Sequence, residues 1–221
     1  MTLSVVIPTL NAGLSLPATV AALGEVSEIV IADGGSEDAT VEVAARAGAK
    51  VIVTARGRGA QLIAGADATR GQWLLFLHAD TVLEPGWRAE AEAFMAEPGN
   101  AMRSAVFRFA VDDPSPRARR LERMVAWRGR VLDLPYGDQG LLLHRDFYRA
   151  LGGFRPLPLM EDVDIIRRIG GGRLRVLKSA AITSAAKWRR DGWTWRSLKN
   201  IILLNLYFAG VPPRILARLY G

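Results

Sequence analysis

In Phe76-Leu77-His78-Ala79-Asp80, an apolar strand that begins at Trp73 runs directly into a carboxylate, and this pattern indicates the class of fold. Strands that are apolar throughout belong to parallel sheets that helices cover on both faces. The carboxyl end of such a strand is where an open α/β sheet binds its ligand. Asp80 is therefore well placed for a metal ion or a phosphate-bearing ligand, and poorly placed for packing.

Around this strand, the first hundred residues alternate between strand and helix patterns, whereas the second half is less regular. We expect strands at residues 3–7, 28–32, 50–53, 72–77, 105–111, 141–143 and 174–177. We expect helices at residues 14–23, 37–47, 61–69, 84–96, 116–132, 161–169 and 193–209, and a last helix after Pro213. Strands that alternate with helices imply right-handed βαβ units, so the fold class is α/β with a mainly parallel central sheet.

The composition bounds the class of protein. A chain of 221 residues fits one large domain, or one domain with an extension, and half of the residues are hydrophobic. The absence of cysteine excludes disulfides and cysteine zinc sites. A net charge of +7 favours anionic partners such as nucleotides or acidic lipids, although solvated Arg-rich helices also explain it. The basic residues are not interleaved with aromatics, so we expect no nucleic-acid partner.

The sequence shows no signal peptide and no membrane span. The start of the chain lacks a basic region, and its apolar run breaks at Pro8. The best apolar candidate, residues 201–211, is interrupted by Asn205 and is shorter than the ~18 residues of a span. We therefore expect a cytoplasmic protein, with peripheral attachment to the inner face of the plasma membrane as the alternative.

Polar and glycine residues follow the first three expected strands. In Asp33-Gly34-Gly35-Ser36 the glycines permit a tight turn and close approach of a ligand to the backbone, and Ser36 can cap the next helix. Asp33 can accept hydrogen bonds from a base or ribose, or it is only a turn residue. Arg56-Gly57-Arg58-Gly59 can wrap a phosphate or stack on a base, and a solvated turn is the alternative.

Asp80 is the candidate metal ligand. Mg²⁺ typically takes one or two carboxylates together with phosphate oxygens of the substrate. His78 lies on the same side of an extended chain as Asp80. We expect His78 either to add a ligand or to form a structural hydrogen bond.

Glu161 and Asp162 open a helix that ends at glycines 170–172. At ~100° per residue, Asp162 falls on the apolar face with three isoleucines, whereas Glu161 and Asp164 fall on the opposite side. Asp164 and Arg168 are spaced for an ion pair. A carboxylate on an apolar face is costly unless it is paired or opens into a cleft. Asp162 is therefore a candidate general base, and a buried Asp–Arg pair is the alternative.

Taken in order, these segments resemble the family 2 glycosyltransferases with a GT-A fold. The matching pieces are Val5-Val6-Ile7-Pro8-Thr9-Leu10-Asn11, Asp33-Gly34-Gly35-Ser36, the Asp80 strand end, Gly152-Gly153-Phe154 and Glu161-Asp162. The resemblance covers roughly residues 2–185 and is greatest to small stand-alone bacterial members. It implies a GT-A domain at residues 1–185, with a nucleotide half of about 1–100 and an acceptor half of about 101–185. A C-terminal helical extension would follow at residues 186–221.

The resemblance implies a nucleotide-diphospho-sugar donor, a Mg²⁺ or Mn²⁺ ion, and inverting transfer of one sugar to an acceptor hydroxyl. The polar turn Tyr136-Gly137-Asp138-Gln139-Gly140 is a candidate loop for that hydroxyl. Together, resemblance and residue patterns assign donor binding to Pro8, Thr9, Asn11, Asp33, Gly34, Arg56, Arg58, Ala79 and Asp80, acceptor binding to Asp138, Gln139 and Gly153, metal binding to Asp80 and His78, and catalysis to Asp162 and Glu161. In this scheme Asp33 holds the base, usually uracil, and Asp162 deprotonates the acceptor.

The chain departs from the family pattern in two respects. The usual Asp-x-Asp motif is His78-Ala79-Asp80, with one carboxylate, and the Gln-x-x-Arg-Trp motif of processive synthases is absent. Lys187-Trp188-Arg189-Arg190 either brings positive charge near the diphosphate or forms a solvated turn. Two alternatives stay open: a non-catalytic nucleotide-binding or membrane-surface module on a GT-A-like fold, and a sugar-nucleotide nucleotidyltransferase. The latter should show a Gly-rich loop followed by lysine near the first strand.

The segment 193–211 combines Trp193, Trp195 and Arg196 with an apolar run. This composition is typical of a helix that lies in a membrane interface, and the acceptor would then be linked to a lipid. A helix that packs on the domain, or a homodimer contact, is the alternative.

Overall fold

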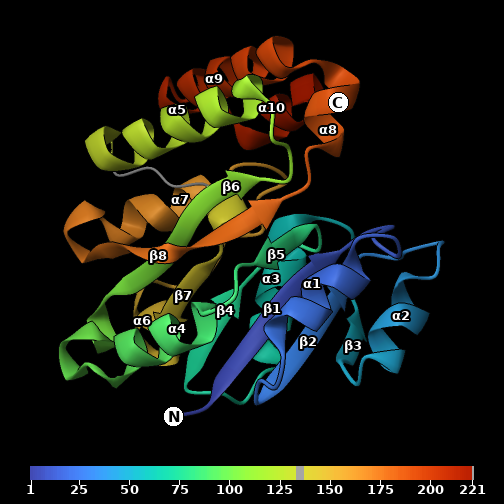
Figure 1. The fold of residues 1–221 in the computed structure, drawn as a ribbon, viewed down its shortest axis with the longest axis vertical. Helices are drawn as coiled ribbons and strands as arrows, with labels where there is room; N and C mark the ends of the chain where they lie inside the picture. Colours follow the sequence, from blue (N-terminus) through green and yellow to red (C-terminus); the bar gives the residue numbers. More distant parts are fainter. Residues whose placement is uncertain (133–136, 221) are drawn as a thin grey trace.

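The computed structural model describes residues 1–132 and 137–220 (Figure 1). Tyr136, in the expected acceptor loop, lies outside the described residues. The strands are β1 (Leu3–Thr9), β2 (Glu28–Asp33), β3 (Lys50–Val53), β4 (Trp73–Phe76), β5 (Thr81–Leu83), β6 (Ser104–Val111), β7 (Leu141–His144) and β8 (Leu174–Thr183). The helices are α1 (Leu16–Leu23), α2 (Thr40–Arg46), α3 (Arg58–Asp67), α4 (Trp87–Ala96), α5 (Pro116–Leu132), α6 (Arg145–Ala150), α7 (Glu161–Ile169), α8 (Ala186–Asp191), α9 (Trp193–Phe208) and α10 (Pro213–Tyr220), with short 3-10 turns η1 (Pro98–Met102), η2 (Gly137–Gln139) and η3 (Gly171–Arg173).

Within the described residues, eight strands form one sheet in the order β3-β2-β1-β4-β7-β6-β8-β5. The first four strands in this order run parallel, as the alternation of strands and helices predicts. β7 joins the two halves of the chain by pairing antiparallel with both β4 and β6. Because β1 and β2 are parallel and in register from Ser4–Glu28 to Thr9–Asp33, their polar carboxyl ends meet at one edge of the sheet.

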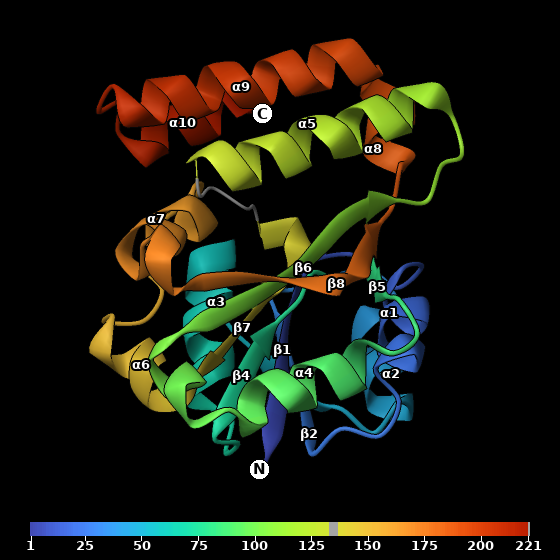
Figure 2. The same cartoon turned by 60° about the vertical axis from the view of Figure 1, so that its left-hand side comes forward.

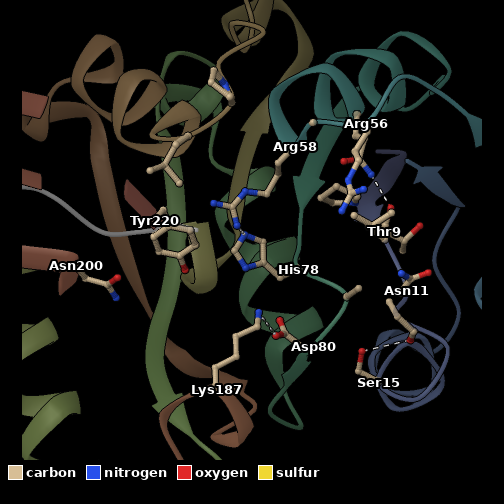
Figure 3. Close-up of a pocket in the computed structure, with 18 of the residues that line it drawn as sticks. Thr9, Asn11, Ser15, Arg56, Arg58, His78, Asp80, Lys187, Asn200 and Tyr220 are labelled. Carbon is tan, nitrogen blue, oxygen red and sulfur yellow. Dashed lines mark hydrogen bonds and ion pairs between the residues drawn. The ribbon is translucent and has the colours of Figure 1, made fainter. Parts of the chain in front are cut away.

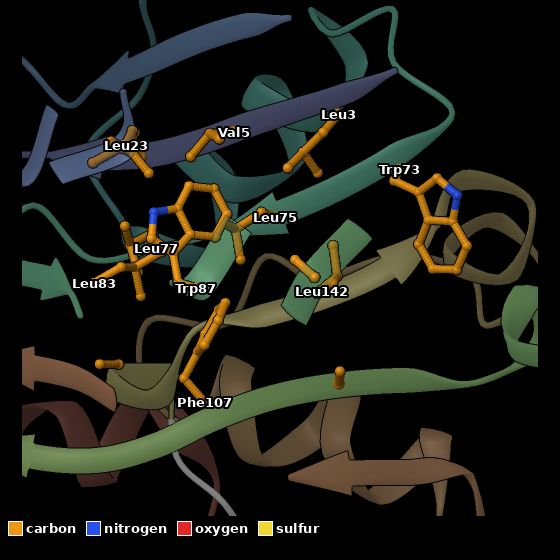
Figure 4. Packing of buried hydrophobic residues seen from close by; sticks show 14 of the residues in the cluster. Leu3, Val5, Leu23, Trp73, Leu75, Leu77, Leu83, Trp87, Phe107 and Leu142 are labelled. Atoms are coloured by element: carbon orange, nitrogen blue, oxygen red, sulfur yellow. The ribbon is translucent and has the colours of Figure 1, made fainter. Parts of the chain in front are cut away.

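Helices cover both faces of the sheet (Figures 1 and 2), so the central strands β1 and β4 bury both of their sides. Val5 and Ile7 of β1 pack in the core under α1 and α4, whereas Val6 faces a second core under α3, α6 and α7. Figure 4 shows the first core, in which Trp87 and Phe107 pack among aliphatic side chains. This two-sided burial explains why the parallel strands are apolar at consecutive positions.

Gly65 lets α3 approach β1 closely. A Cβ atom at this position would lie 2.4 Å from Cγ1 of Val6, a distance that real Cβ contacts essentially never show. α3 begins at Arg58, so this packing also fixes the helix that carries Arg58 toward the carboxyl edge of the sheet.

A third layer lies beyond β6, where α5 packs on Phe109 and Val111 together with Trp188 of α8. α9 and α10 run alongside α5 in this layer (Figure 2). α8, α9 and α10 lie within residues 186–221, the segment that was expected to form a C-terminal extension. None of the helices in the described part of the chain is long and apolar enough to cross a membrane.

Two strands and two helices differ from the sequence-based expectation. β8 runs on to Thr183 instead of ending near Leu177, because it pairs with β6 and with the short β5 over its second half. The segments that form β5, α6 and α8 had no expected element. Partners distant in sequence stabilise these short segments, so local patterns carry little signal for them.

Candidate active site

A cleft of about 990 Å³ opens at the carboxyl ends of β1 and β4 (Figure 3). It brings together most of the expected donor-binding residues. These are Pro8, Thr9, Asn11, Arg56, Arg58, Ala79 and Asp80, with His78. The opposite wall comes from α8, α9 and α10 and consists of Lys187, Arg190, Asp191, Trp195, Arg196, Lys199, Asn200 and Tyr220.

The loop after β1 is fixed by hydrogen bonds to the loop after β2. Asn11 adopts a left-handed conformation, with φ of 51°. Its backbone N–H donates to Ser36 Oγ at 2.8 Å, and its Oδ1 atom accepts from the backbone N–H of Glu37 at 2.9 Å. The side chain of Asn11 is therefore committed to this junction, while its exposed position still leaves it on the rim of the cleft.

Asp33 is buried in this junction rather than presented to the cleft, which differs from its expected contact with a base. Its Oδ1 atom accepts hydrogen bonds from Thr9 Oγ1 at 2.8 Å and Ser36 Oγ at 2.5 Å. Its Oδ2 atom accepts from the backbone N–H groups of Gly35 and Ser36 at 3.0 and 2.8 Å. Burial raises the pKa of Asp33, but these hydrogen bonds outweigh it and lower the pKa on balance. These four hydrogen bonds are those expected of a turn residue, and the contact with a base stays a prediction.

Gly34 packs beside Gln61. Gln61 was not among the residues that the sequence patterns singled out. Gln61 Nε2 donates to the carbonyl oxygens of Thr9 at 2.6 Å and Ala32 at 2.8 Å, and so ties α3 to the ends of β1 and β2. A Cβ atom at Gly34 would lie 3.1 Å from Gln61 Nε2. Gly34 is buried, so its contribution to the cleft is indirect.

Glu161 is buried at the start of α7, although the helical projection placed it on the polar side. Its side chain is 1% exposed, and its Oε1 atom accepts a hydrogen bond from Nε of Arg58. Burial raises the pKa of Glu161, with Arg58 opposing. Its Oε2 atom has no hydrogen-bond partner among the described residues. Glu161 thus holds Arg58 at the cleft and is not itself among the residues that line it.

Asp164 is also buried, although the helical projection placed it on the polar side of the helix. It is buried between Arg155, at 3.0 Å, and Arg168, at 2.5 Å. The second contact confirms the expected i,i+4 ion pair. The projection failed for Glu161 and Asp164 because it compares residues only within the helix, whereas arginines from other elements cover this side of α7.

His78 stands next to Arg58 in the cleft (Figure 3). Its Nε2 atom lies 3.4 Å from Nη1 of Arg58. Burial, together with the positive charge of Arg58, lowers the pKa of His78 to about 4, so its ring is neutral near pH 7. This geometry gives His78 a contact with Arg58.

Asp80 forms an ion pair with Lys187, whose Nζ atom lies 3.0 Å from Asp80 Oδ2 (Figure 3). Burial raises the pKa of Asp80, but Lys187 and His78 outweigh it, so the carboxylate is ionised at neutral pH. The described residues contain no group of three His, Cys, Asp or Glu side chains that could hold a metal ion. Asp80 supplies one carboxylate, so a divalent cation held here would need its remaining ligands from a diphosphate and water.

A second cavity of about 140 Å³, here called the side cavity, shares Arg58, Asp80, Lys187, Arg196 and Tyr220 with the cleft. Besides Asp80, two further carboxylates line it, Asp138 and Asp162. Its apolar part consists of Leu159, Met160, Val163, Trp188 and Leu203. Asp162 is partly exposed and accepts a hydrogen bond from the backbone N–H of Val163 at 2.8 Å. The expected base therefore faces a cavity that adjoins the cleft.

The expected acceptor residues separate in the structure. Burial raises the pKa of Asp138 to about 6 against the opposing charge of Arg128, and its Oδ1 atom has no hydrogen-bond partner among the described residues. Gln139 is buried, and its Nε2 atom donates to the carbonyl oxygen of Phe107 at 2.9 Å. Gly153, with φ of 64°, packs against the ring of Tyr148. Of the three, only Asp138 lines the side cavity.

The wall formed by α8 to α10 holds residues that sequence analysis placed outside the donor site. Arg196 Nη1 lies 2.5 Å from Asp191 Oδ2, and its guanidinium lies 5.4 Å from the ring centroid of Trp188. The hydroxyl of Tyr220 is 3.0 Å from Arg196 Nη2, and Lys199 Nζ donates to the carbonyl oxygen of Tyr220 at 2.7 Å. The basic run from Lys187 to Arg190 was the one sequence signal for this wall.

This sheet, with its cleft at the carboxyl edge and an acidic residue at the end of β4, defines the GT-A class of nucleotide-sugar transferase folds. The family model described as glycosyl transferase family 2 matches residues 4–156. The chain therefore belongs to glycosyltransferase family 2.

Known proteins agree with this assignment over parts of the chain. A PGL/p-HBAD biosynthesis glycosyltransferase of Mycobacterium bovis is 36% identical over 106 residues, which cover 42% of this chain and 41% of that protein. An uncharacterized glycosyltransferase of Mycobacterium tuberculosis is 38% identical over 84 residues, or 38% of each chain. The matches thus span about two fifths of the length of these curated relatives.

The solved structures confirm the fold. Glucosyl-3-phosphoglycerate synthase of Mycobacterium tuberculosis, in complex with Mn²⁺, UDP-glucose and phosphoglyceric acid, superposes with a TM-score of 0.60 at 20% identity. The match covers 83% of this chain and 70% of that chain. The same enzyme with Mn²⁺, UDP and glucosyl-3-phosphoglycerate gives a TM-score of 0.59 at 21% identity.

Proposed function

We propose that the protein is an inverting glycosyltransferase that moves one sugar from a nucleotide-diphospho-sugar to an acceptor hydroxyl. The observation that carries this proposal is the convergence of three elements on connected cavities. The loop after β1 and Asp80 line the cleft, and Asp162 lines the adjoining side cavity. These are the parts that a donor, its leaving diphosphate and a base for the acceptor require.

The charges near Asp80 suit a leaving diphosphate. Glycosyl transfer passes through an oxocarbenium-like state, while negative charge builds on the leaving group. Arg58, held by Glu161, and Lys187, held by Asp80, present two fixed cations to the cleft. Such fixed charges stabilise developing negative charge without reorganising during the reaction.

A Mg²⁺ or Mn²⁺ ion would be held by Asp80 together with diphosphate oxygens, and would supply further positive charge to the leaving group. His78, neutral and 3.4 Å from Arg58, positions that guanidinium. Pro8, Thr9, Asn11, Arg56 and Ala79 form the remaining donor surface.

Asp162 is the proposed base that takes the proton from the acceptor hydroxyl. One base is sufficient for a single in-line displacement with inversion. Asp138 lines the same cavity and is proposed to contact the acceptor. Because the pKa of Asp138 is raised to about 6, both of its protonation states are accessible near neutral pH, and it can donate or accept a hydrogen bond there.

The test is release of nucleoside diphosphate from a panel of nucleotide-sugars, measured with Mn²⁺ for the wild type and Asp162→Asn. General-base catalysis contributes about 10²–10⁴-fold, so the variant should lose that much turnover while donor affinity changes little. Asp138→Asn is the matched control, since it alters another carboxylate of the side cavity and leaves Asp80 in place. If Asp138→Asn is the inactive variant and Asp162→Asn keeps near-native turnover, the base is assigned wrongly.

The same assay separates the alternatives. A nucleotidyltransferase would release pyrophosphate from a nucleoside triphosphate and a sugar phosphate. A binding module would bind the donor without turnover.

We also propose peripheral contact with the inner face of the plasma membrane, so that the protein works in the cytoplasm. The outer side of α9 exposes Leu198, Ile201, Ile202 and Phe208, each 40–47% accessible. Apolar side chains on a helix of a basic protein suit an anionic lipid surface, and the acceptor would then be linked to a lipid. Co-sedimentation with anionic and neutral vesicles tests this contact, and a dimer in solution with no vesicle binding would assign the same surface to a homodimer instead.

In this proposal the catalytic unit comprises residues 1–185, and residues 186–221 form an extension that completes the cleft. Lys187, Arg196 and Tyr220 of the extension line both cavities. Removal of the extension should therefore abolish turnover.

A further inference from the structure

We propose that the acceptor carries a phosphate group and that Arg196 and Lys199 bind it. This inference rests on the proposed function, because it names the class of acceptor for the same site. The structural basis is a pair of cations that already bind two oxygens of Tyr220 at the junction of the cleft and the side cavity.

The wall formed by α8 to α10 carries more positive charge than the donor needs. Among the described residues, it presents Lys187, Arg190, Arg196 and Lys199 to the cleft, and one carboxylate, that of Asp191. Lys187 is committed to Asp80, where the donor diphosphate is proposed to lie. The remaining three cations and Asp191 leave two positive charges on this wall for a second anionic ligand.

Arg196 is built into this wall rather than solvated. Its side chain is 13% exposed, its Nη1 atom is anchored by Asp191, and its guanidinium lies over Trp188. Both anchors fix the orientation of the guanidinium, so Nη2 points to a defined place. A fixed planar guanidinium of this kind is well suited to the oxygens of a phosphate.

The contacts of Tyr220 show that both cations are placed to bind oxygen atoms. Its hydroxyl oxygen lies 3.0 Å from Arg196 Nη2, and its carbonyl oxygen accepts from Lys199 Nζ at 2.7 Å. Each cation is thus already at hydrogen-bond distance from an oxygen atom, the kind of ligand that a phosphate offers. Because Tyr220 is 41% exposed, a ligand can displace it without opening the core.

The position of this site suits the acceptor rather than the donor. Figure 3 shows Tyr220 and Asn200 on the side of the cleft opposite Thr9 and Asn11, with Arg58 and His78 between them. Arg196 and Tyr220 also line the side cavity, which contains the proposed base Asp162. A phosphate held here leaves the rest of the acceptor facing Asp162 and the apolar side chains beside it.

The experiment compares acceptors in matched pairs with the donor and Mn²⁺ at saturation. One pair is a short polyol and its phosphate monoester in solution, and the other is a polyprenol and its phosphate in neutral vesicles. In at least one of the two pairs, we expect nucleoside diphosphate release to be about tenfold faster, or more, with the phosphorylated acceptor than with its neutral partner. The soluble pair and the vesicle pair then distinguish a free phosphate ester from a lipid phosphate.

Variants assign the effect to the two cations. Lys199→Met and Arg196→Gln should each raise the acceptor KM at least about tenfold, or about 1.4 kcal/mol. Arg214→Gln, on the exposed side of α10 and outside both cavities, is the matched control and should leave KM unchanged. Tyr220→Phe removes the competing hydroxyl and should lower KM.

A binding measurement keeps the test independent of turnover and of folding defects in Arg196→Gln. With the nucleoside diphosphate and Mn²⁺ bound, millimolar inorganic phosphate should raise the melting temperature of the wild type and of Arg214→Gln, but not of Lys199→Met.

Equal rates with phosphorylated and neutral acceptors, or equal KM values for Lys199→Met and Arg214→Gln, would overturn the inference while leaving the transferase assignment intact. Absence of nucleotide binding and of turnover with every donor would refute the proposed function as well.

Discussion

Replacing Asp138 with asparagine should stabilise the protein at neutral pH. Burial raises the pKa of this carboxyl group from 3.8 to about 6 in the folded state. A raised pKa means that folding favours the protonated form, so the stability that this group contributes is complete below pH 3.8 and is lost as the pH rises through 6. At about 1.36 kcal/mol per pKa unit, ionisation of Asp138 costs the folded state up to about 3 kcal/mol above pH 7.

Asparagine does not ionise, so the variant escapes this loss. Between pH 4.5 and 7.5, linkage predicts that the difference in unfolding free energy between variant and wild type moves by about 2 kcal/mol in favour of the variant. For a chain of this size, this change corresponds to a relative shift in melting temperature of about 4–8 °C. The prediction concerns how the difference in unfolding free energy changes with pH. Any cost of the new amide group that does not depend on pH therefore cancels.

Urea unfolding followed by tryptophan fluorescence at both pH values measures this difference. Asp113→Asn is the control with opposite sign. Hydrogen bonds from Ser115, aided by Arg189, lower the pKa of Asp113 to about 2, so its stabilising contribution is present at neutral pH and lost in acid. A difference for Asp138→Asn that stays constant with pH, or that moves against the variant, would refute the assignment of a buried, destabilised carboxyl group.

Two further changes test the packing and the charges of the cleft. Lys187→Met should weaken binding of a nucleoside diphosphate about tenfold in EDTA, because the variant lacks the positive charge beside Asp80. With Mn²⁺ the loss of affinity should be smaller, because the ion then supplies that positive charge. Calorimetry measures both affinities, and equal losses in the two conditions would contradict this role of Lys187. Gly65→Ala should lower the unfolding free energy by about 1–3 kcal/mol, because its Cβ would lie 2.4 Å from a methyl group of Val6. Urea unfolding tests the latter, with Gly99→Ala, where a Cβ meets open space, as the control.

Local patterns predicted the first half of the fold well. Apolar strands and their glycine-rich ends are properties of consecutive residues, and β1 to β4 follow them closely. The Asp164–Arg168 pair was predictable for the same reason, since both partners lie on one helix. The hydrogen bonds of Asp33 within its own turn were also predictable, because Gly35 and Ser36 lie two and three residues after it.

Contacts between distant segments were not predictable. The side of α7 that carries Glu161 is decided by Arg58, which precedes it by 103 residues. In the same way, β8 extends because β5 and β6, which are distant in sequence, pair with it. Arg196 and Tyr220 enter the site only because α9 and α10 line the cleft together with the ends of β1 and β4. Sequence patterns thus located the strand ends of the donor site, whereas the wall of basic residues required the structure.

The most direct test of the central claim is thermal stabilisation by a panel of nucleotides (UDP, GDP, ADP, CMP and dTDP), with and without Mn²⁺. A ligand that binds only the folded state raises stability by RT ln(1 + [L]/Kd), about 2.7 kcal/mol at a hundredfold excess over Kd. The cleft with Arg58, Asp80 and Lys187 predicts a shift with one nucleoside diphosphate, larger when Mn²⁺ is present. Melting curves that no nucleotide moves would contradict a donor site in this cleft.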